Sequence, residues 1–295
     1  MKTSILRLAF ALLLLPPPAG ATAGARQKSP AAGAPAGRVV VFAVEKYESR
    51  VMIEPAFIYS GGAFVKPPTD DAGAAPFARS YFRAGRAYRL LSGGGDAGAV
   101  TVRKHLEPGC VGLVAEATAE TQARLGGRVQ ALATDSDTLG RGAAGSRRAP
   151  TEAERAAAVG LARAAYAKNG APAALVALMQ VVNLTATDLD RDGRAELVGS
   201  FLVEKKEGES AADAYTLFLI MEPAGGAFRT AWEWFHHGFE GEFADRHFVD
   251  QVDLDGDGVG EVVAEGTYYE SNDYVVYKRT QGRWRPVYQG GGGGC

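Results

Sequence analysis

Two short acidic loops contain the residues of this 295-residue chain that are best suited to chemistry. Each loop has the pattern Asp-x-Asp-x-Asp-Gly-x-x-Glu, and the second copy begins 65 residues after the first. Carboxylates at alternate positions of a tight loop converge on one point, and a calcium ion takes roughly six to eight oxygen ligands. We therefore predict a cation site in each loop, with the backbone carbonyls of Arg194 and Val259 as further ligands. The acidic ligands are Asp188, Asp190, Asp192 and Glu196 in the first loop and Asp253, Asp255, Asp257 and Glu261 in the second.

The charge of these loops favours a bound cation over a bare acidic turn. Asp and Gly are common in surface turns, so the pattern alone also fits a turn that binds nothing. Two unit charges about 4 Å apart, however, repel by about 4 kcal/mol at an effective dielectric constant of roughly 20. Each loop holds four carboxylates, and no basic residues are spaced within the loops so as to neutralise all of them. Many anionic oxygens in a flexible loop suit calcium better than magnesium, so we predict two calcium sites.

The loops differ from helix-loop-helix calcium sites. Such a site needs a bidentate Glu at its twelfth position, and helices on both sides. The twelfth position is Gly199 in the first loop and Ala264 in the second. The residues that follow the loops, Leu197-Val198 and Val262-Val263, are strand-like. The loops are therefore expected to connect β-strands.

The strands around the two loops form a repeat. With the strand that precedes its loop, each copy is expected to be a unit of four antiparallel strands, the size of one propeller blade. A propeller needs roughly four to eight blades, so we expect the two units to pack on each other or on the rest of the chain. The strand-like segments after the loops are residues 196–204, 215–222 and 228–234 in the first copy and 261–269, 274–279 and 284–288 in the second.

With these features, residues from about 180 to 289 resemble the FG-GAP/VCBS-like calcium-loop repeats of integrin α-chain propellers and of many secreted bacterial proteins. In that family an Asp-rich loop joins two strands of a blade. The resemblance implies that the acidic residues of both loops are calcium ligands. The chain departs from the family pattern because Glu196 and Glu261 stand where Asp is usual, and the Phe-Gly and Gly-Ala-Pro signatures are absent.

The N-terminus has the pattern of a signal peptide over residues 1–25. Lys2 and Arg7 precede an apolar run from Leu8 to Leu15, and small residues typical of a cleavage site follow. As a helix this run would span only about 12 Å, which is too short for a membrane span. The pattern predicts a secreted or periplasmic protein.

The rest of the chain supplies the elements that must position the loops. Short segments rich in Val, Ile, Tyr and Phe predict a small β-rich domain, and the Gly-rich residues 92–96 are expected to form a hairpin turn within it. Thr151 and Glu154 form a capping box that begins a helix. The fold class is mainly β, of the α+β type. The predicted segments are a linker (26–37), a β-rich domain of unknown role (38–140), a connecting helix (151–170), the two-copy repeat domain (175–289) and a Gly-rich tail (290–295).

The pairing of the two cysteines stays open at this point. In an oxidising compartment Cys110 and Cys295 could form a disulfide that stabilises the chain by about 5 kcal/mol. Equally, Cys110 could be a small core residue and Cys295 a free or intermolecular thiol.

Residues 232–248, between the loops, gather aromatic side chains and histidines. Their alternation fits a strand packed on the core. Two alternatives are a surface that stacks on a sugar or a peptide, and a transition-metal site built from the histidines. Glu240 and Glu242 could be imagined as a glycosidase pair, although carboxylates two apart on a strand usually face solvent. The segment's aromatic and histidine residues are Trp232, Trp234, Phe235, His236, His237, Phe239, Phe243, His247 and Phe248.

These observations favour a secreted, calcium-binding, non-catalytic protein in which calcium stabilises the repeats and supports binding of a protein or a glycan. The alternative is a secreted hydrolase or carbohydrate-binding enzyme that uses residues 232–248. The 32 basic and 34 acidic residues give no positive excess for binding nucleic acid. No apolar run is long enough to cross a membrane, and no nucleophile elbow or His-Glu-x-x-His motif is present.

Overall fold

The computed structural model describes residues 37–294, except residues 108–111, 208–209 and 240. The predicted signal peptide, most of the predicted linker, Cys110 and Cys295 lie outside the described residues. Within the described part, the chain forms fifteen strands and three helices. The mainly β fold class predicted from the sequence is therefore confirmed.

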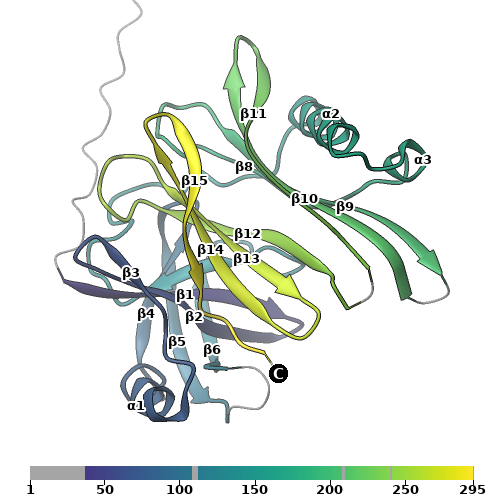
Figure 1. The fold of residues 1–295 in the computed structure, drawn as a ribbon. Helices are drawn as coiled ribbons and strands as arrows, with labels where there is room; N and C mark the ends of the chain where they lie inside the picture. Colours follow the sequence, from purple (N-terminus) through teal and green to yellow (C-terminus); the bar gives the residue numbers. More distant parts are fainter. Residues whose placement is uncertain (1–36, 108–111, 208–209, 240, 295) are drawn as a thin grey trace, which may run out of the picture.

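Residues 38–134 form an antiparallel barrel with one helix (Figure 1). Six strands pair in the order β1-β7-β4-β5-β6-β2, and β2 pairs back onto β1, so the sheet is closed. The short β3 extends the sheet from β2. The elements are β1 (Arg38–Tyr47), β2 (Arg50–Ser60), β3 (Ala63–Val65), α1 (Asp71–Tyr81), β4 (Ala87–Ser92), β5 (Gly95–His105), β6 (Ala115–Thr121) and β7 (Ala131–Thr134).

The first strand shows why this region contains a continuous apolar run. Val40 and Phe42 belong to the core inside the barrel, whereas Val39 and Val41 pack outside it against the C-terminal part of the chain. A strand that is buried on both faces has no polar face and therefore no alternation.

Helix α1 was not predicted from the sequence. Its eleven residues include Gly73 and Pro76, which sequence patterns associate with turns. The Asp70 carboxylate caps the helix by accepting a hydrogen bond of 2.8 Å from the Gly73 amide. Phe77 joins the barrel core, so burial of its side chain stabilises a segment of weak helix propensity.

The hairpin turn predicted within residues 92–96 is confirmed, and the structure places it at Gly93-Gly94. Ser92 pairs with Gly95, so the turn between β4 and β5 has two residues. The φ angles of Gly93 and Gly94 are 61° and 75°. Two successive positive φ angles are typical of the type I′ turn that favours glycine.

The connecting helix also agrees with the sequence. Helix α2 spans Glu152–Lys168, and Thr151 and Glu154 form both hydrogen bonds of the capping box. The short helix α3 (Ala173–Val176) follows. Tyr166 of α2 is fully buried, and its hydroxyl donates to the carbonyls of Phe201 and Tyr215 at 2.8 and 3.1 Å.

The C-terminal part contains two four-stranded antiparallel sheets, as the repeat predicts. We call them the first and the second sheet. In each sheet the strands pair in chain order, so both are simple meanders. Their strands are β8 (Gln180–Thr187), β9 (Glu196–Glu207), β10 (Ser210–Ala224) and β11 (Ala227–Gly238) in the first, and β12 (Ala244–Val252), β13 (Glu261–Tyr268), β14 (Asn272–Thr280) and β15 (Arg283–Gly290) in the second.

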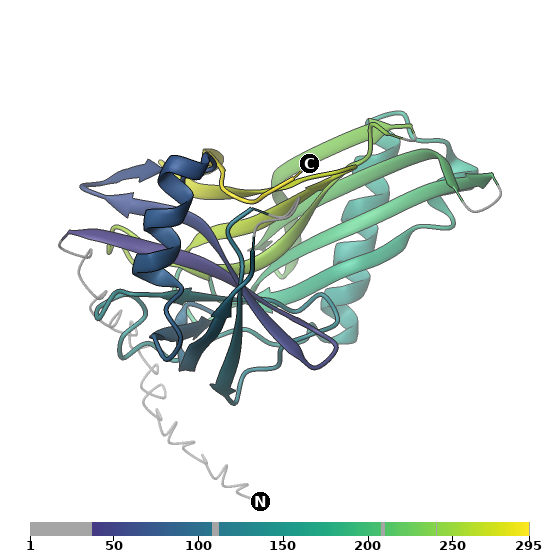
Figure 2. The ribbon, with the colours of Figure 1, turned by 90° about the horizontal axis from the view of Figure 1, so that it is seen from below.

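The chain stacks these parts in layers, which Figures 1 and 2 show from two sides. The first sheet packs one face on α2 and the other on the second sheet. The second sheet packs its remaining face on the outside of the barrel, where Val263 and Val276 meet Val41 and Phe57. Within the described part of the chain, each of the two sheets therefore packs against another element on both of its faces.

Candidate cation-binding loops

The two acidic loops occupy the same place in the two sheets. Each connects the first strand of its sheet to the second, β8 to β9 and β12 to β13. The loops are also neighbours in space, because the Gly260 amide donates a hydrogen bond of 2.7 Å to the Leu189 carbonyl. The Arg191 guanidinium of the first loop lies 3.8 Å from the Asp253 carboxylate of the second.

Three acidic side chains converge in each loop. Carboxylate oxygens of Asp188, Asp190 and Glu196 lie within 4.8 Å of one another. Those of Asp253, Asp255 and Glu261 do the same, and we call these sets the first and the second triad. The first, third and ninth positions of the predicted pattern therefore meet, and the two triads are arrangements that could hold a metal ion.

The backbone holds the carboxylates of both triads in the same way. The Leu189 amide donates to Glu196 at 2.7 Å, and the Leu254 amide donates to Glu261 at 2.8 Å. A glycine amide likewise donates to the first aspartate of each loop. Those glycines, Gly193 and Gly258, have φ angles of 88° and 87°, a conformation that favours glycine over other residues. The glycine of the pattern therefore permits the sharp turn of each loop.

The fifth position of the pattern does not join either triad. Asp192 accepts a hydrogen bond of 2.8 Å from the Arg194 amide, and Asp257 accepts one of 2.8 Å from the Val259 amide. Each aspartate therefore stabilises its turn by bonding the backbone two residues ahead. The structure thus brings together six of the eight predicted acidic ligands and uses the other two locally.

Burial makes the triads electrostatically costly. The glutamates are the most buried members, with exposed fractions of 3% for Glu196 and 2% for Glu261. Burial raises the pKa of Glu196 to about 8. It raises the pKa of Glu261 to about 7, even though a hydrogen bond from Lys278 favours the charged form. Burial also raises the pKa of Asp188 and of Asp253. A cation within each triad would offset this cost.

Basic side chains from outside the loops approach both of them, which the spacing within the loops does not predict. The Arg279 guanidinium lies 2.9 Å from Asp190, and the Lys278 ammonium lies 2.7 Å from Asp255 and 2.5 Å from Glu261. Both residues come from β14, which lies outside the loop pattern, so the spacing of the loop residues does not reveal them. Successive residues of a strand point to opposite faces, so one strand serves both loops.

A buried polar network fixes the first loop to the barrel. The Gln251 side-chain amide donates to the carbonyls of Asp188 and Gly93 at 3.2 and 3.1 Å. Asp250, which is fully buried, accepts a hydrogen bond of 2.8 Å from the Gly93 amide. Burial raises the pKa of Asp250 to about 6, although the neighbouring Arg147 guanidinium favours the charged form.

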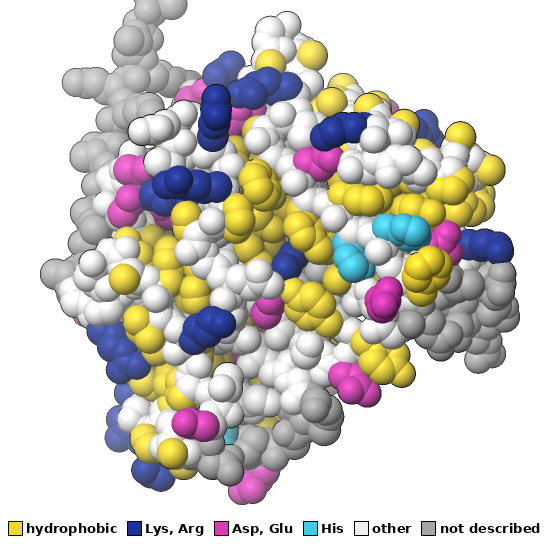
Figure 3. All heavy atoms as spheres, viewed as in Figure 1, with side chains coloured by type: hydrophobic (Ala, Val, Ile, Leu, Met, Phe, Trp, Pro, Cys, Tyr) yellow, Lys and Arg dark blue, Asp and Glu magenta, His cyan; other side chains and the backbone are white. Residues whose placement is uncertain are grey.

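Residues 232–248 are divided between the core and the surface. Trp232 packs beside Tyr277 and Phe248 is fully buried, as the strand interpretation predicts. Phe239 is 56% exposed. Figure 3 shows histidine side chains beside hydrophobic ones on one face of the molecule. Of the two glutamates considered as a glycosidase pair, Glu242 is exposed, as expected for a solvent-facing carboxylate, and Glu240 lies outside the described residues.

The histidines of this segment have separate partners. His237 contacts Asp213, and His247 contacts Asp245 at 2.8 Å. His236 contacts the Glu242 carbonyl at 2.7 Å. Among the described residues, the clusters suited to a metal contain no histidine, so the structure does not support the alternative of a histidine metal site.

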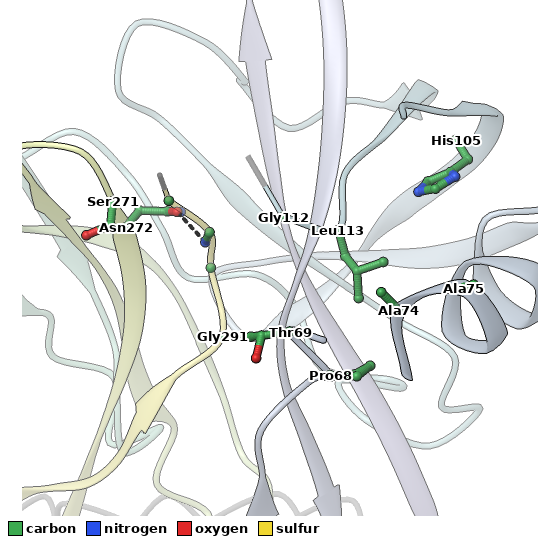
Figure 4. A pocket seen from close by; sticks show the side chains of 13 residues that line it. Pro68, Thr69, Ala74, Ala75, His105, Gly112, Leu113, Ser271, Asn272 and Gly291 are labelled. Carbon is green, nitrogen blue, oxygen red and sulfur yellow. Dashed lines mark hydrogen bonds between the residues drawn. The ribbon is translucent and has the colours of Figure 1, made fainter. Parts of the chain in front are cut away.

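A cavity of about 690 Å³ lies away from the loops (Figure 4). Its walls are mostly apolar side chains and glycine backbone, and they include Leu113, Ala74 and the tail residue Gly291. His105 is the ionisable side chain among its described lining residues. None of its described lining residues carries a carboxylate, so they offer no cation site beyond the two loops.

Comparisons with known proteins give no further assignment. No protein-family model matches the chain, and no match was found among curated proteins or solved structures. The resemblance to FG-GAP/VCBS-like repeats therefore stays a prediction from the loop pattern. Within the described residues, no helix is both long enough and apolar enough to cross a membrane.

Proposed function

We propose that this chain is a secreted, non-catalytic protein that binds calcium in its Asp-rich loops, and that calcium stabilises the two C-terminal sheets. The observation that carries the proposal is the recurrence of one carboxylate triad at the same connection of two sheets. Each triad is held by the same backbone hydrogen bonds, as a preformed ion site requires.

The electrostatics of the triads support a cation. Two charged carboxylates whose oxygens lie within 4.8 Å of one another repel by about 3 kcal/mol or more at an effective dielectric constant of roughly 20, and three carboxyl groups meet in each triad. Burial of the glutamate in each triad adds the cost of removing a charged carboxylate from water. A divalent ion replaces mutual repulsion by attraction to a common centre, and oxygen-only ligands favour a hard cation such as calcium.

The position of the loops supports a structural role for the ion. Both loops lie at the junction of the two sheets, and the first is hydrogen-bonded to residues that contact the barrel. An ion at a concentration tenfold above its dissociation constant stabilises the folded state by about 1.4 kcal/mol per site. For a chain of this size, that corresponds to a rise of about 4 °C in melting temperature per site.

The proposal is tested by calorimetric titration of calcium into the chain without its predicted signal peptide. We expect heat of binding and a higher melting temperature in calcium than in EDTA. The double variant Asp190→Asn, Asp255→Asn should lose both effects, whereas Asp137→Asn, an exposed control outside the loops, should retain them. A parallel titration with magnesium checks ion selectivity. Identical melting with calcium and with EDTA, together with no heat of binding, would refute the proposal.

A further inference from the structure

The two triads differ at one equivalent position of the neighbouring strand. Leu197 follows the glutamate of the first loop and pairs with Met221, while Val262 follows that of the second loop and pairs with Tyr277. The next residue toward the loop is Glu222 in the first sheet and Lys278 in the second. The same register position therefore holds a negative charge beside the first loop and a positive charge beside the second.

The Lys278 ammonium lies among the carboxylates of the second loop. It contacts Asp255 at 2.7 Å, Glu261 at 2.5 Å and Asp257 at 3.7 Å. The remaining acidic side chain of the loop, Asp253, lies 3.8 Å from the Arg191 guanidinium. All four carboxylates of the second loop therefore have a cationic partner supplied by the chain.

Among the described residues, no single basic side chain joins carboxylates of the first triad, because Arg194 contacts Asp192, outside the triad, at 2.7 Å. Arg279 contacts Asp190, but its guanidinium is shared with Glu222 at 3.4 Å. Among the described residues, Asp188 and Glu196 form no salt bridge. The Oδ1 atom of Asp190 is buried and has no hydrogen-bond partner in the described part of the chain. Among the described residues, the first triad thus has one basic partner, Arg279, which it shares with Glu222, whereas the second triad has two, Arg191 and Lys278.

We propose that Lys278 is a built-in counter-ion of the second triad, so that the chain binds one calcium ion tightly, in the first loop. This inference rests on the proposed function, and it gives the two loops different calcium affinities: the first loop binds calcium tightly and the second does not. The ammonium competes with calcium for Asp255 and Glu261. It is tethered to the fold, so it acts at a high effective concentration and is not removed by a chelator.

The surroundings of Lys278 allow this competition to be tested by substitution. Lys278, Asp255 and Glu261 line a cavity of about 550 Å³, together with Tyr59 and Tyr288. The Lys278 side chain is 24% exposed. Replacing it therefore removes a charge at the edge of a cavity and need not disturb a packed core.

The experiment measures the stoichiometry of calcium binding by calorimetric titration with calcium chloride. The unchanged chain should bind one ion tightly, with any second site at least tenfold weaker. Lys278→Gln removes the charge and should bind two ions, whereas the matched control Lys278→Arg keeps the charge and should bind one. Two sites of equal affinity in the unchanged chain, or a single site in the Gln variant of a chain that binds calcium, would overturn the inference.

Melting in EDTA separates this inference from the proposed function. The Gln variant leaves the second triad without its ammonium and should melt about 5 °C or more below both the unchanged chain and the Arg variant. If no variant binds calcium, the proposed function is refuted. In that case, a lower melting temperature of the Gln variant in EDTA still supports the counter-ion role of Lys278. Equal melting temperatures of the Gln variant, the Arg variant and the unchanged chain refute that role as well.

Discussion

Replacing Glu54 with Gln should remove a defined part of the pH dependence of stability. Glu54 lies on β2 of the barrel and faces β14 of the second sheet. Its carboxylate accepts hydrogen bonds from the Tyr274 hydroxyl at 2.7 Å and the Asn272 side-chain amide at 2.9 Å. Burial raises the pKa of Glu54 from 4.5 to about 7, and the nearby charge of Glu265 adds to the rise, while the two hydrogen bonds oppose it.

The sign of the effect follows from proton linkage. The folded state binds the Glu54 proton more tightly than the unfolded state, because the pKa is higher in the folded state. The resulting stabilisation is complete below about pH 4.5 and is lost as the pH rises through about 7. The difference between the two pKa values corresponds to about 3 kcal/mol, an upper value because part of the side chain still contacts solvent.

The assay is urea unfolding in EDTA at pH 5 and pH 7.5, which covers most of this titration. Between these pH values, the unchanged chain should lose about 2 kcal/mol more unfolding free energy than Glu54→Gln, because the amide stays neutral. The acidic loops titrate in both chains, so the difference between the chains isolates Glu54. Glu120→Gln, an exposed control on β6, should behave like the unchanged chain. Equal pH dependence in Glu54→Gln and the unchanged chain would refute the reasoning.

Two further predictions concern the junction and the tail. Asp250→Asn should lower the unfolding free energy, measured by urea unfolding, by about 3–5 kcal/mol, because it leaves the buried Arg147 charge without its partner. A loss below about 1 kcal/mol would contradict this expectation. Gly112 packs against the backbone of Gly292 and Gly293. Cys110 and Cys295 lie outside the described residues, and in the sequence Cys110 is two residues from Gly112 and Cys295 two residues from Gly293. In an oxidising compartment we expect these two cysteines to form a disulfide. Alkylation without reduction should therefore add no mass, and two added alkyl groups would exclude the disulfide.

The repeat sheets could be predicted well because the acidic loops mark their positions. Once Asp188 and Asp253 are aligned, the β-branched segments that follow fall into register, and the strands adopt that order. The cap at Thr151 predicts α2 equally well, since its hydrogen bonds are local. Such features depend on residues a few positions apart.

Features that depend on distant residues could not be predicted in this way. Closure of the barrel needs β1 to pair with both β2 and β7, and no local pattern specifies the second pairing. The basic partners of the loops, Lys278 and Arg279, approach them only because β14 runs past both. Asp192 and Asp257 match the ligand pattern, yet each has a backbone amide within reach that its carboxylate bonds instead.

The tip of the β4–β5 hairpin has a consequence for how the molecule unfolds. Gly93 accepts hydrogen bonds from Ser146 and Gln251 and donates one to Asp250, so this one residue joins the barrel, the segment between β7 and α2, and the second sheet. A Cβ atom at Gly93 would lie 2.5 Å from the backbone nitrogen of Arg147, so the three parts are closely packed at this residue. Barrel and sheets should therefore melt in a single cooperative transition, and occupancy of the first loop should slow amide exchange in barrel strands that never touch the ion.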